Sequence, residues 1–332
     1  MPTNYGVKGQ CPLWGFGGEA PKVLNFHPRK DSLLMKKLTG SIVALVTPFM
    51  EDGSVNYDKL NELIDYHIKN KTDCVSILGT TGESPTISHD EEEIIVAHVL
   101  KHANGRIPIM VGSGSNDTAT AVKYSKKFEK MGASYLLVLT PYYNRTNDSG
   151  MTKHYLKIAD AVNIGVMLYN VPARTGCAIS INTIKTLAKH KNIIGIKEAS
   201  GDFSYCMKVA KYISNDFSLY SGNDDIIMPL MAIGASGAVS VLANFMPWVV
   251  NKIIHSYLDG DHQTARNLQL QYLDLINALF VETNPIPLKY VMNKLGFNVG
   301  LYRLPLDNPD PHLQKTLDTL LAAHNIKEVK LQ

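Results

Sequence analysis

Short apolar segments recur along the chain from Ser41 onward, and each is followed by polar or glycine-rich residues and then by a stretch of helical period. Most of these segments are continuously apolar, which is the pattern of parallel strands buried on both faces. Eight of them occupy about 200 residues, or roughly 25 residues for each strand and helix, a spacing typical of one (β/α)8 barrel. The predicted strands cover residues 41–47, 74–78, 107–112, 135–140, 164–170, 192–197, 217–222 and 236–242.

The pattern changes at both ends of this region. Residues 1–34 are rich in glycine and proline and lack the apolar core of a signal peptide, so we expect a flexible extension. After Leu242 only helical patterns remain, broken at residues 284–287 because two prolines cannot lie inside one helix. We therefore predict an α/β protein with a (β/α)8 TIM barrel over residues 35–245 and a helical domain over residues 246–332. A doubly wound α/β fold is the alternative, but it usually has fewer such units.

Composition narrows the class of protein. The 332 residues are 45% hydrophobic and 19% charged with a formal net charge of +3, as in an ordinary globular protein. No run of basic residues suggests nucleic acid as a partner, and no apolar stretch reaches the roughly 20 residues of a membrane span. The four cysteines are Cys11, Cys74, Cys177 and Cys206. Because no two of them have CxxC spacing, we predict that they are free thiols and that the protein is cytoplasmic.

A helix is predicted to begin at Ser88, because Glu91 follows three residues later and the two form a capping box. His98 and His102 on this helix have the spacing of a metal-binding pair. They lie outside any HExxH motif and away from the barrel mouth, so a solvated helix face is the better interpretation. We predict no metal site.

Lys197 ends the sixth predicted strand, where it follows the largely apolar residues 192–196. In a (β/α)8 barrel this end of the strands carries the active site. Desolvation there disfavours the charged ammonium and makes the neutral amine available to attack a carbonyl carbon. A salt bridge with Glu198 is the alternative, although neighbouring side chains of a strand face opposite sides. We predict a Schiff-base lysine.

Hydroxyl, amide and basic side chains follow other predicted strands at the same end. Thr80 and Thr81 lie in a glycine-flanked turn that suits a carboxylate, although a plain connecting turn is an equal alternative. The planar guanidinium of Arg174 suits a second carboxylate, with a surface arginine as the alternative. The remaining strand-end candidates are Tyr142, Tyr143, Tyr169, Asn170, Gly222, Asn223 and Asp224.

Five segments resemble one enzyme family in their order and spacing: GSIVALVTPF, GTTGE, TPYYN, YNVPARTG and GIKEASGD. Over about residues 37–330 the chain is similar to the dihydrodipicolinate synthase family, whose wider group of Schiff-base barrels includes N-acetylneuraminate lyase and sugar-acid aldolases. The resemblance implies condensation of pyruvate with L-aspartate 4-semialdehyde in lysine and diaminopimelate biosynthesis. It implies no cofactor.

The resemblance also assigns roles to residues. Lys197 would form the imine with pyruvate, whose carboxylate would bind Thr80 and Thr81. Tyr169 would transfer protons and be linked through Thr81 to Tyr143, which in this family enters the site from a neighbouring subunit. A homotetramer, built as a dimer of dimers, is therefore implied. The substrate-binding residues would be Thr81, Arg174, Gly222, Val239 and Asn284, with Arg174 orienting the carboxylate of the semialdehyde.

Many bacterial members of this family are inhibited by lysine at a dimer interface. Ser84, His89, Asn116 and Tyr142 match that allosteric site. Glu92 stands where sensitive enzymes have a histidine, and Thr120 stands where they have a glutamate. Without the carboxylate that pairs with the amino group of lysine, a buried charge stays unpaired. We predict weak inhibition or none.

Two alternatives remain open at this point. A pyruvate-dependent sugar-acid aldolase or N-acetylneuraminate lyase would use the same Lys197 and Tyr169. Its polyhydroxylated substrate would, however, need partners for hydroxyl groups at the position where the Arg174 guanidinium suits a carboxylate. A ligand-sensing barrel without catalytic activity is the alternative from another class. It would not need a lysine and tyrosines at these strand ends.

Overall fold

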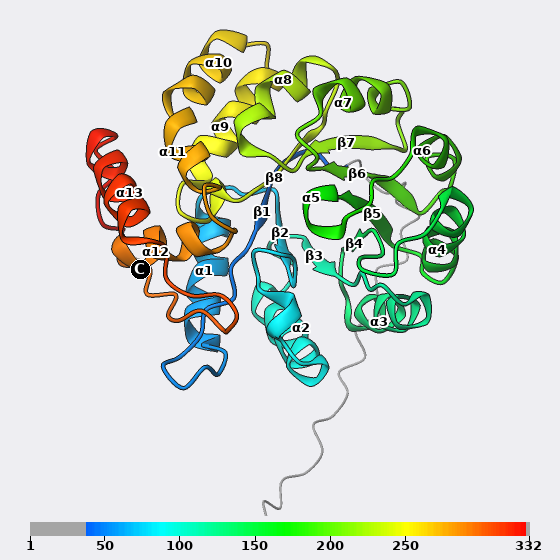
Figure 1. Cartoon of the computed structure of the whole chain (residues 1–332), viewed down its shortest axis with the longest axis horizontal. Coiled ribbons are helices and arrows are strands. Elements are labelled where there is room, and N and C mark those ends of the chain that lie inside the picture. Colours follow the sequence, from blue (N-terminus) through cyan, green and yellow to red (C-terminus); the bar gives the residue numbers. More distant parts are fainter. Residues whose placement is uncertain (1–37, 330–332) are drawn as a thin grey trace, which may run out of the picture. The chain divides into compact units, whose positions relative to one another are not determined.

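The computed structural model describes residues 38–329, and the extension expected over residues 1–34 lies outside them. Eight parallel strands form one closed barrel in chain order, with β1 hydrogen-bonded to both β2 and β8 (Figure 1). The predicted (β/α)8 barrel is confirmed, and every strand coincides with a predicted apolar segment, although β1 begins one residue earlier and β6 ends one residue later than predicted. The strands are β1 (Gly40–Ala44), β2 (Cys74–Ile77), β3 (Ile109–Gly112), β4 (Tyr135–Leu139), β5 (Gly165–Asn170), β6 (Ile193–Glu198), β7 (Ser218–Ser221) and β8 (Gly237–Ser240).

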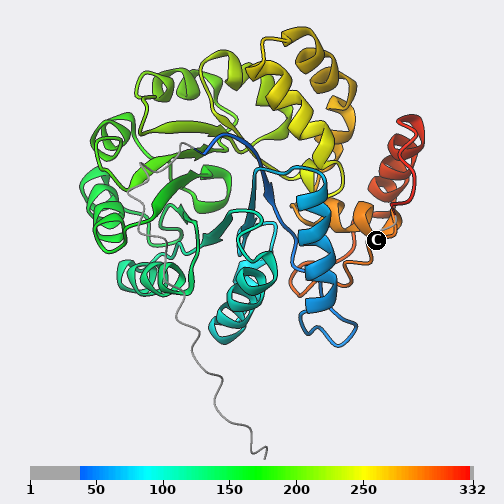
Figure 2. The same cartoon turned by 180° about the vertical axis from the view of Figure 1, so that it is seen from behind.

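Helices surround the strands in both views of the barrel (Figure 1 and Figure 2). After β8, α9 packs against β1 and β8, and further helices follow it, so the predicted C-terminal helices are present. The boundary expected between residues 245 and 246 stays a prediction. The helices are α1 (Tyr57–Lys69), α2 (His89–Ala103), α3 (Thr118–Met131), α4 (Asp148–Asp160), α5 (Pro172–Thr175), α6 (Ile181–Leu187), α7 (Phe203–Ala210), α8 (Ile227–Ala232), α9 (Pro247–Leu258), α10 (His262–Gln271), α11 (Leu273–Ala278), α12 (Ile286–Lys294) and α13 (Pro311–Ala323), with 3-10 turns η1 (Ser84–Thr86), η2 (Asp224–Ile226) and η3 (Leu242–Asn244).

Local sequence signals fix several helix ends. The Ser88 hydroxyl accepts from the Glu91 amide and the Glu91 carboxylate accepts from the Ser88 amide, which confirms the capping box at the start of α2. The helical pattern is interrupted between α11 and α12, as the two prolines predict. Pro287 nevertheless lies inside α12, because the first turn of a helix needs no hydrogen bond from its backbone nitrogens.

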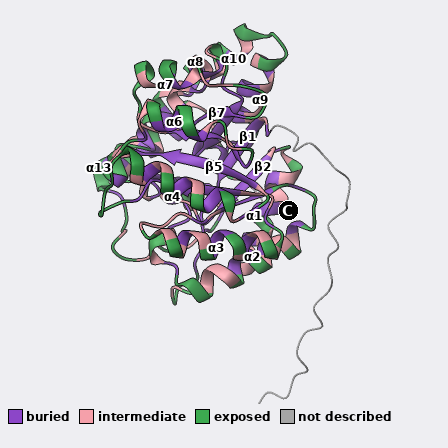
Figure 3. Ribbon diagram, turned by 90° about the vertical axis from the view of Figure 1, so that its right-hand side faces the viewer, coloured by how far each residue is buried: buried purple, intermediate pink, exposed green. Residues whose placement is uncertain are grey.

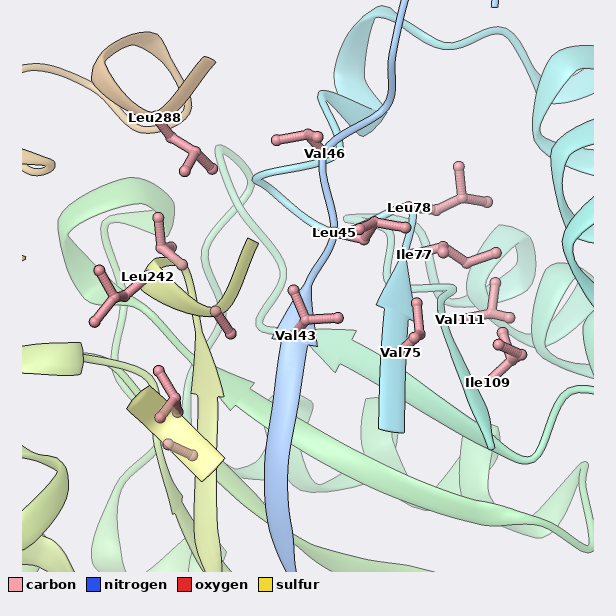
Figure 4. Close-up of a cluster of buried hydrophobic side chains, with 14 of the residues drawn as sticks. Val43, Leu45, Val46, Val75, Ile77, Leu78, Ile109, Val111, Leu242 and Leu288 are labelled. Carbon is pink, nitrogen blue, oxygen red and sulfur yellow. The ribbon is translucent and has the colours of Figure 1, made fainter. Parts of the chain in front are cut away.

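Two apolar clusters divide the core, because successive residues of each strand face opposite sides of the sheet. One fills the barrel interior and includes Ile42, Met167 and Val239. The larger cluster lies between strands and helices and includes Val43 and Val75 (Figure 4). Figure 3 shows the resulting gradient from buried strands to exposed outer helix faces. The carboxyl ends of the strands meet at one end of this barrel, which is where such barrels carry their active sites.

Three thiols lie within the part of the chain that the structure describes. Cys74, Cys177 and Cys206 are free, whereas Cys11 lies outside that part. None of the helices formed by residues 38–329 is long and apolar enough to cross a membrane.

Candidate active site

Lys197 lies on the inner face of β6 and is only 6% exposed. Its cross-strand partners are Tyr169 on β5 and Tyr220 on β7, both buried. The Lys197 Nζ lies 4.2 Å from the centroid of the Tyr169 ring. Within residues 38–329 this amine makes no hydrogen bond and no ion pair. The side chain is thus a buried amine without a hydrogen-bond or ion-pair partner among these residues.

A bulge in β6 sets which way this lysine faces. Pairing with β5 shifts register opposite Gly195, and a Cβ there would lie 2.3 Å from the Ser218 carbonyl oxygen, so only glycine fits. After the bulge Ile196 packs in the outer cluster and Lys197 turns inward. Glycine at this position therefore supports the lysine two residues later.

Glu198 faces away from Lys197, so the salt bridge weighed as an alternative does not form. Its carboxylate accepts from Asn170 Nδ2 at 2.7 Å and from the Ser200 amide at 2.6 Å. Burial raises the pKa of the Glu198 carboxyl. Asn170 in turn accepts from the Ile179 amide at 3.0 Å, which fixes the segment after α5. Glu198 and Asn170 thus belong to the scaffold behind the site.

The glycine-flanked turn after β2 brings Thr80 and Thr81 to the barrel mouth. Thr81 is 2% exposed, and its Oγ1 accepts from Asn284 Nδ2 at 2.9 Å. Asn284 also accepts at its backbone oxygen from Arg174 Nη2 at 2.9 Å. The structure therefore brings Thr81, Asn284 and Arg174 together, although they come from the turn after β2, the segment before α12, and α5.

Arg174 itself is largely exposed in this chain, and its hydrogen bond to Asn284 occupies only one edge of the guanidinium. The buried Asn284 Oδ1 has no hydrogen-bond partner within the described residues. Unpaired donors and acceptors at a barrel mouth are what a polar ligand would satisfy.

Tyr143 is 94% exposed and has a left-handed backbone with φ of 67°. Among residues 38–329 it makes no hydrogen bond to Thr81, and Tyr169 makes none either. The relay from Tyr169 through Thr81 to Tyr143 stays a prediction.

Gly222 directly follows β7, and Val239 lies within β8. The Gly222 amide donates to the Glu198 backbone oxygen at 2.7 Å, and a Cβ at Gly222 would lie 2.7 Å from the Ala199 Cβ. Val239 is buried in the inner cluster. Glycine after β7 therefore lets two strand ends approach closely beside Lys197.

Asp224 is a buried carboxylate to which sequence analysis gave no role. Its Oδ2 accepts from the backbone amides of Val241 and Leu242 at 2.9 and 2.8 Å. Burial raises the pKa of this carboxyl, while hydrogen bonds from Ser240 and the two backbone amides, and the charge of Lys197, act in the opposite direction. The interaction ties the end of β7 to the segment after β8. The only sign of Asp224 in the sequence was its position as an acidic residue after a predicted strand.

The four candidate allosteric residues lie on loops and helix starts after β2, β3 and β4. The exposed His89 stacks on Tyr124, with ring centroids 4.5 Å apart, and its Nδ1 lies 2.9 Å from Glu92 Oε2. The Asn116 carbonyl accepts from Asn144 Nδ2 at 3.0 Å. Ser84 is half-buried and Tyr142 is 40% exposed. A regulatory role for this set stays a prediction.

Among the residues that the structure describes, no three His, Cys, Asp or Glu side chains lie close enough to hold a metal ion. The groups that the site does offer are an amine, hydroxyls, backbone amides and a guanidinium. This donor set suits carboxylate recognition beside a nucleophilic amine.

Comparison with known proteins agrees with this chemistry. The model of the dihydrodipicolinate synthetase family matches residues 37–324. A protein of Clostridium acetobutylicum named 4-hydroxy-tetrahydrodipicolinate synthase 1 is 46% identical over 292 residues, which is 88% of this chain and 99% of the relative.

Two solved structures extend the likeness to the fold. The dihydrodipicolinate synthase of Aquifex aeolicus is 38% identical with a TM-score of 0.85, over 88% of this chain and all of that one. The chloride-inhibited dihydrodipicolinate synthase of Acinetobacter baumannii, solved in complex with pyruvate, is 37% identical with a TM-score of 0.84, over 87% of this chain and 99% of that one.

A (β/α)8 barrel with a buried lysine at the carboxyl end of its sixth strand defines an enzyme of the class I aldolase type. Within that class, the chain belongs to the dihydrodipicolinate synthetase family. The resemblance seen in the sequence motifs is thereby confirmed.

Proposed function

We propose that the chain condenses pyruvate with L-aspartate 4-semialdehyde through an imine on Lys197, as a 4-hydroxy-tetrahydrodipicolinate synthase of lysine and diaminopimelate biosynthesis. The observation that carries this proposal is the buried Lys197 amine above Tyr169, without a hydrogen bond or ion pair among residues 38–329. Relatives that are 46% identical and carry the synthase name support the choice of substrates.

Lys197 starts the reaction by attacking the keto carbon of pyruvate, and the adduct loses water to form the imine. The protonated imine nitrogen then accepts the electron pair left when a proton leaves the methyl carbon, and this gives an enamine. Tyr169 lies beside the amine and is the group that moves these protons. Thr80, Thr81 and the amides of their turn bind the pyruvate carboxylate.

The enamine carbon attacks the aldehyde carbon of the second substrate. The amino group of the semialdehyde then attacks the imine carbon and displaces Lys197 as the ring closes. Arg174 and Asn284 meet at the mouth, where the guanidinium binds the carboxylate of this substrate. Gly222 and Val239 form the wall beside Lys197.

The closest alternative is a pyruvate-dependent aldolase acting on a sugar acid. Arg174 favours the synthase, because a guanidinium matches a carboxylate better than it matches a chain of hydroxyl groups. Turnover of a sialic acid or keto-deoxy sugar acid that exceeds turnover of the semialdehyde would reverse the choice.

An assembly of four chains is part of the proposal, as is a cytoplasmic location. The exposed Tyr143, held in a left-handed conformation, is suited to reach a second copy of the chain. Sedimentation velocity measures the assembly directly, and a monomer with full activity would exclude a role for Tyr143 across an interface.

Borohydride trapping with pyruvate tests the reaction. We expect a reduced pyruvyl adduct on the peptide that contains Lys197, identified by mass spectrometry, and pyruvate-dependent consumption of the semialdehyde. Folded protein that shows neither adduct nor turnover would overturn the proposal and favour a barrel that only binds ligands.

A further inference from the structure

Glu83 and Lys289 form an ion pair whose side chains are both fully buried, with Lys289 Nζ 2.8 Å from Glu83 Oε1. Glu83 is the last residue of the turn after β2, and Lys289 lies on α12. The second carboxylate oxygen of Glu83 accepts from the Arg303 backbone amide at 3.1 Å. Both oxygens of this carboxylate are therefore held by the C-terminal part of the chain.

Lys289 makes further contacts with its ammonium. It donates to the backbone oxygens of Thr47, at 3.4 Å, and Leu301. Its Nζ also lies 4.6 Å from the ring centroid of Phe49 and 5.5 Å from that of Tyr302. One ammonium thus joins the segment after β1, the turn after β2 and the segment after α12.

The turn that carries Thr81 is anchored from two sides. Glu83, two residues later, has a left-handed backbone with φ of 58°. The intervening Gly82 accepts at its backbone oxygen from Thr47 Oγ1 at 2.7 Å, and a Cβ there would lie 3.2 Å from the Leu45 carbonyl oxygen. The two residues that follow Thr81 are therefore both held in place, Gly82 by Thr47 and Glu83 by Lys289 and Arg303.

Stability alone does not account for this pair. Burial lowers the pKa of Lys289, which reflects the cost of removing its charge from water. Replacing a buried ion pair by apolar residues of similar volume is often neutral or stabilising. Leu288, the neighbour of Lys289, shows that this helix already packs apolar side chains toward Val46 (Figure 4).

We propose that Glu83 and Lys289 are positioning residues that hold the Thr80–Thr81 turn in the geometry that binds the pyruvate carboxylate. This inference rests on the proposed function. It makes the C-terminal helices a determinant of pyruvate affinity, although Lys289 touches no substrate.

The test compares steady-state kinetics of three variants with the wild-type enzyme. Lys289→Met breaks the pair, and Glu83→Gln combined with Lys289→Met removes both charges. Lys294→Met is the matched control, because Lys294 lies on the same helix and forms an exposed ion pair with Asp318 at 2.8 Å. Melting temperature is recorded for each variant, together with imine trapping by the wild type.

We expect both Lys289 variants to raise KM for pyruvate by about tenfold or more, which is the effect of a lost carboxylate contact. KM for the semialdehyde should change less than about twofold, and the control should match the wild type. If the single variant fails to fold, the double variant decides, since it leaves no unpaired buried charge.

A double variant that melts like the wild type and has an unchanged KM for pyruvate would overturn the inference, and so would a double variant that does not fold. Equal changes in KM for both substrates would also overturn it. Absence of imine in the wild type would instead overturn the proposed function, and the inference with it, so the two failures are distinguishable.

Discussion

Lys197 and Tyr169 are cross-strand partners on β6 and β5, and the lysine Nζ lies 4.2 Å from the centroid of the tyrosine ring. The phenol ring covers the amine on one side, and the barrel interior encloses the rest of the lysine side chain. Two predictions concern this pair directly.

Replacing Lys197 by Met should abolish the borohydride-trapped pyruvyl adduct and lower kcat by at least about 1,000-fold, because the nucleophile is lost while the side-chain volume is kept. Circular dichroism checks the fold. Lys208→Met, on an exposed face of α7, is the matched control and should keep both adduct and turnover. A Lys197→Met variant that still turns over pyruvate would place the nucleophile elsewhere.

Replacing Tyr169 by Phe keeps the ring above Lys197 and removes only the hydroxyl. We expect imine trapping to persist, with kcat lowered about 100- to 10,000-fold, the usual contribution of a general acid–base group. Single-turnover measurements separate imine formation from the later steps. An unchanged kcat would assign the proton transfer to another group.

Arg174→Lys keeps the positive charge but loses the planar fork. KM for the semialdehyde should rise by about tenfold or more, and KM for pyruvate should change little, since a lysine cannot bind a carboxylate at two points. Equal effects on both substrates would contradict separate carboxylate sites for Thr81 and Arg174.

Lysine should inhibit weakly or not at all, because Thr120 offers a hydroxyl that already donates to Asp117 Oδ2 at 2.6 Å. Thr120→Glu should increase inhibition by supplying a carboxylate in the first turn of α3, where the helix dipole tolerates negative charge. Initial rates over a lysine titration measure both. Sub-millimolar inhibition of the wild type would contradict the prediction.

The protein should lose stability in acid through His67. Burial lowers the pKa of this imidazole from 6.5 to about 3. Between these two pH values His67 is protonated in the unfolded chain and neutral in the folded chain. The contribution is complete above pH 6.5 and falls by about 1.4 kcal/mol per unit as pH drops toward 3.

Urea unfolding between neutral pH and pH 4.5 measures this dependence. His67→Gln should reduce the slope by about one proton, because the amide can keep the bond to Thr72 Oγ1, which is 3.0 Å from His67 Nδ1. An identical slope in the variant would mean that other groups cause the acid sensitivity.

Sequence reasoning located the strands because continuous apolar segments leave little alternative at this spacing. It also located Lys197, since a charge at the end of such a segment stands out. The bulge at Gly195 was not predicted, because one glycine among apolar residues gives no sign of a register shift.

The pairing of Glu83 with Lys289 escaped prediction for a different reason. The two residues are 206 positions apart, and each belongs to a segment that was assigned another role. A charged residue in a sequence is normally expected to be exposed to solvent. The burial of both side chains is therefore seen only in the structure, where α12 lies against the turn after β2.

The Glu83–Lys289 pair also bears on the order in which a growing chain acquires its parts. Synthesis delivers Thr81 early and Lys197 midway, whereas Lys289 and Arg303 leave the ribosome near the end. A nascent chain that has emerged as far as β8 contains all eight strands and Lys197, but it still lacks Lys289 and Arg303, which hold the Glu83 carboxylate. The contacts around the turn of Thr80 and Thr81 are therefore complete only after the C-terminal part has been synthesised.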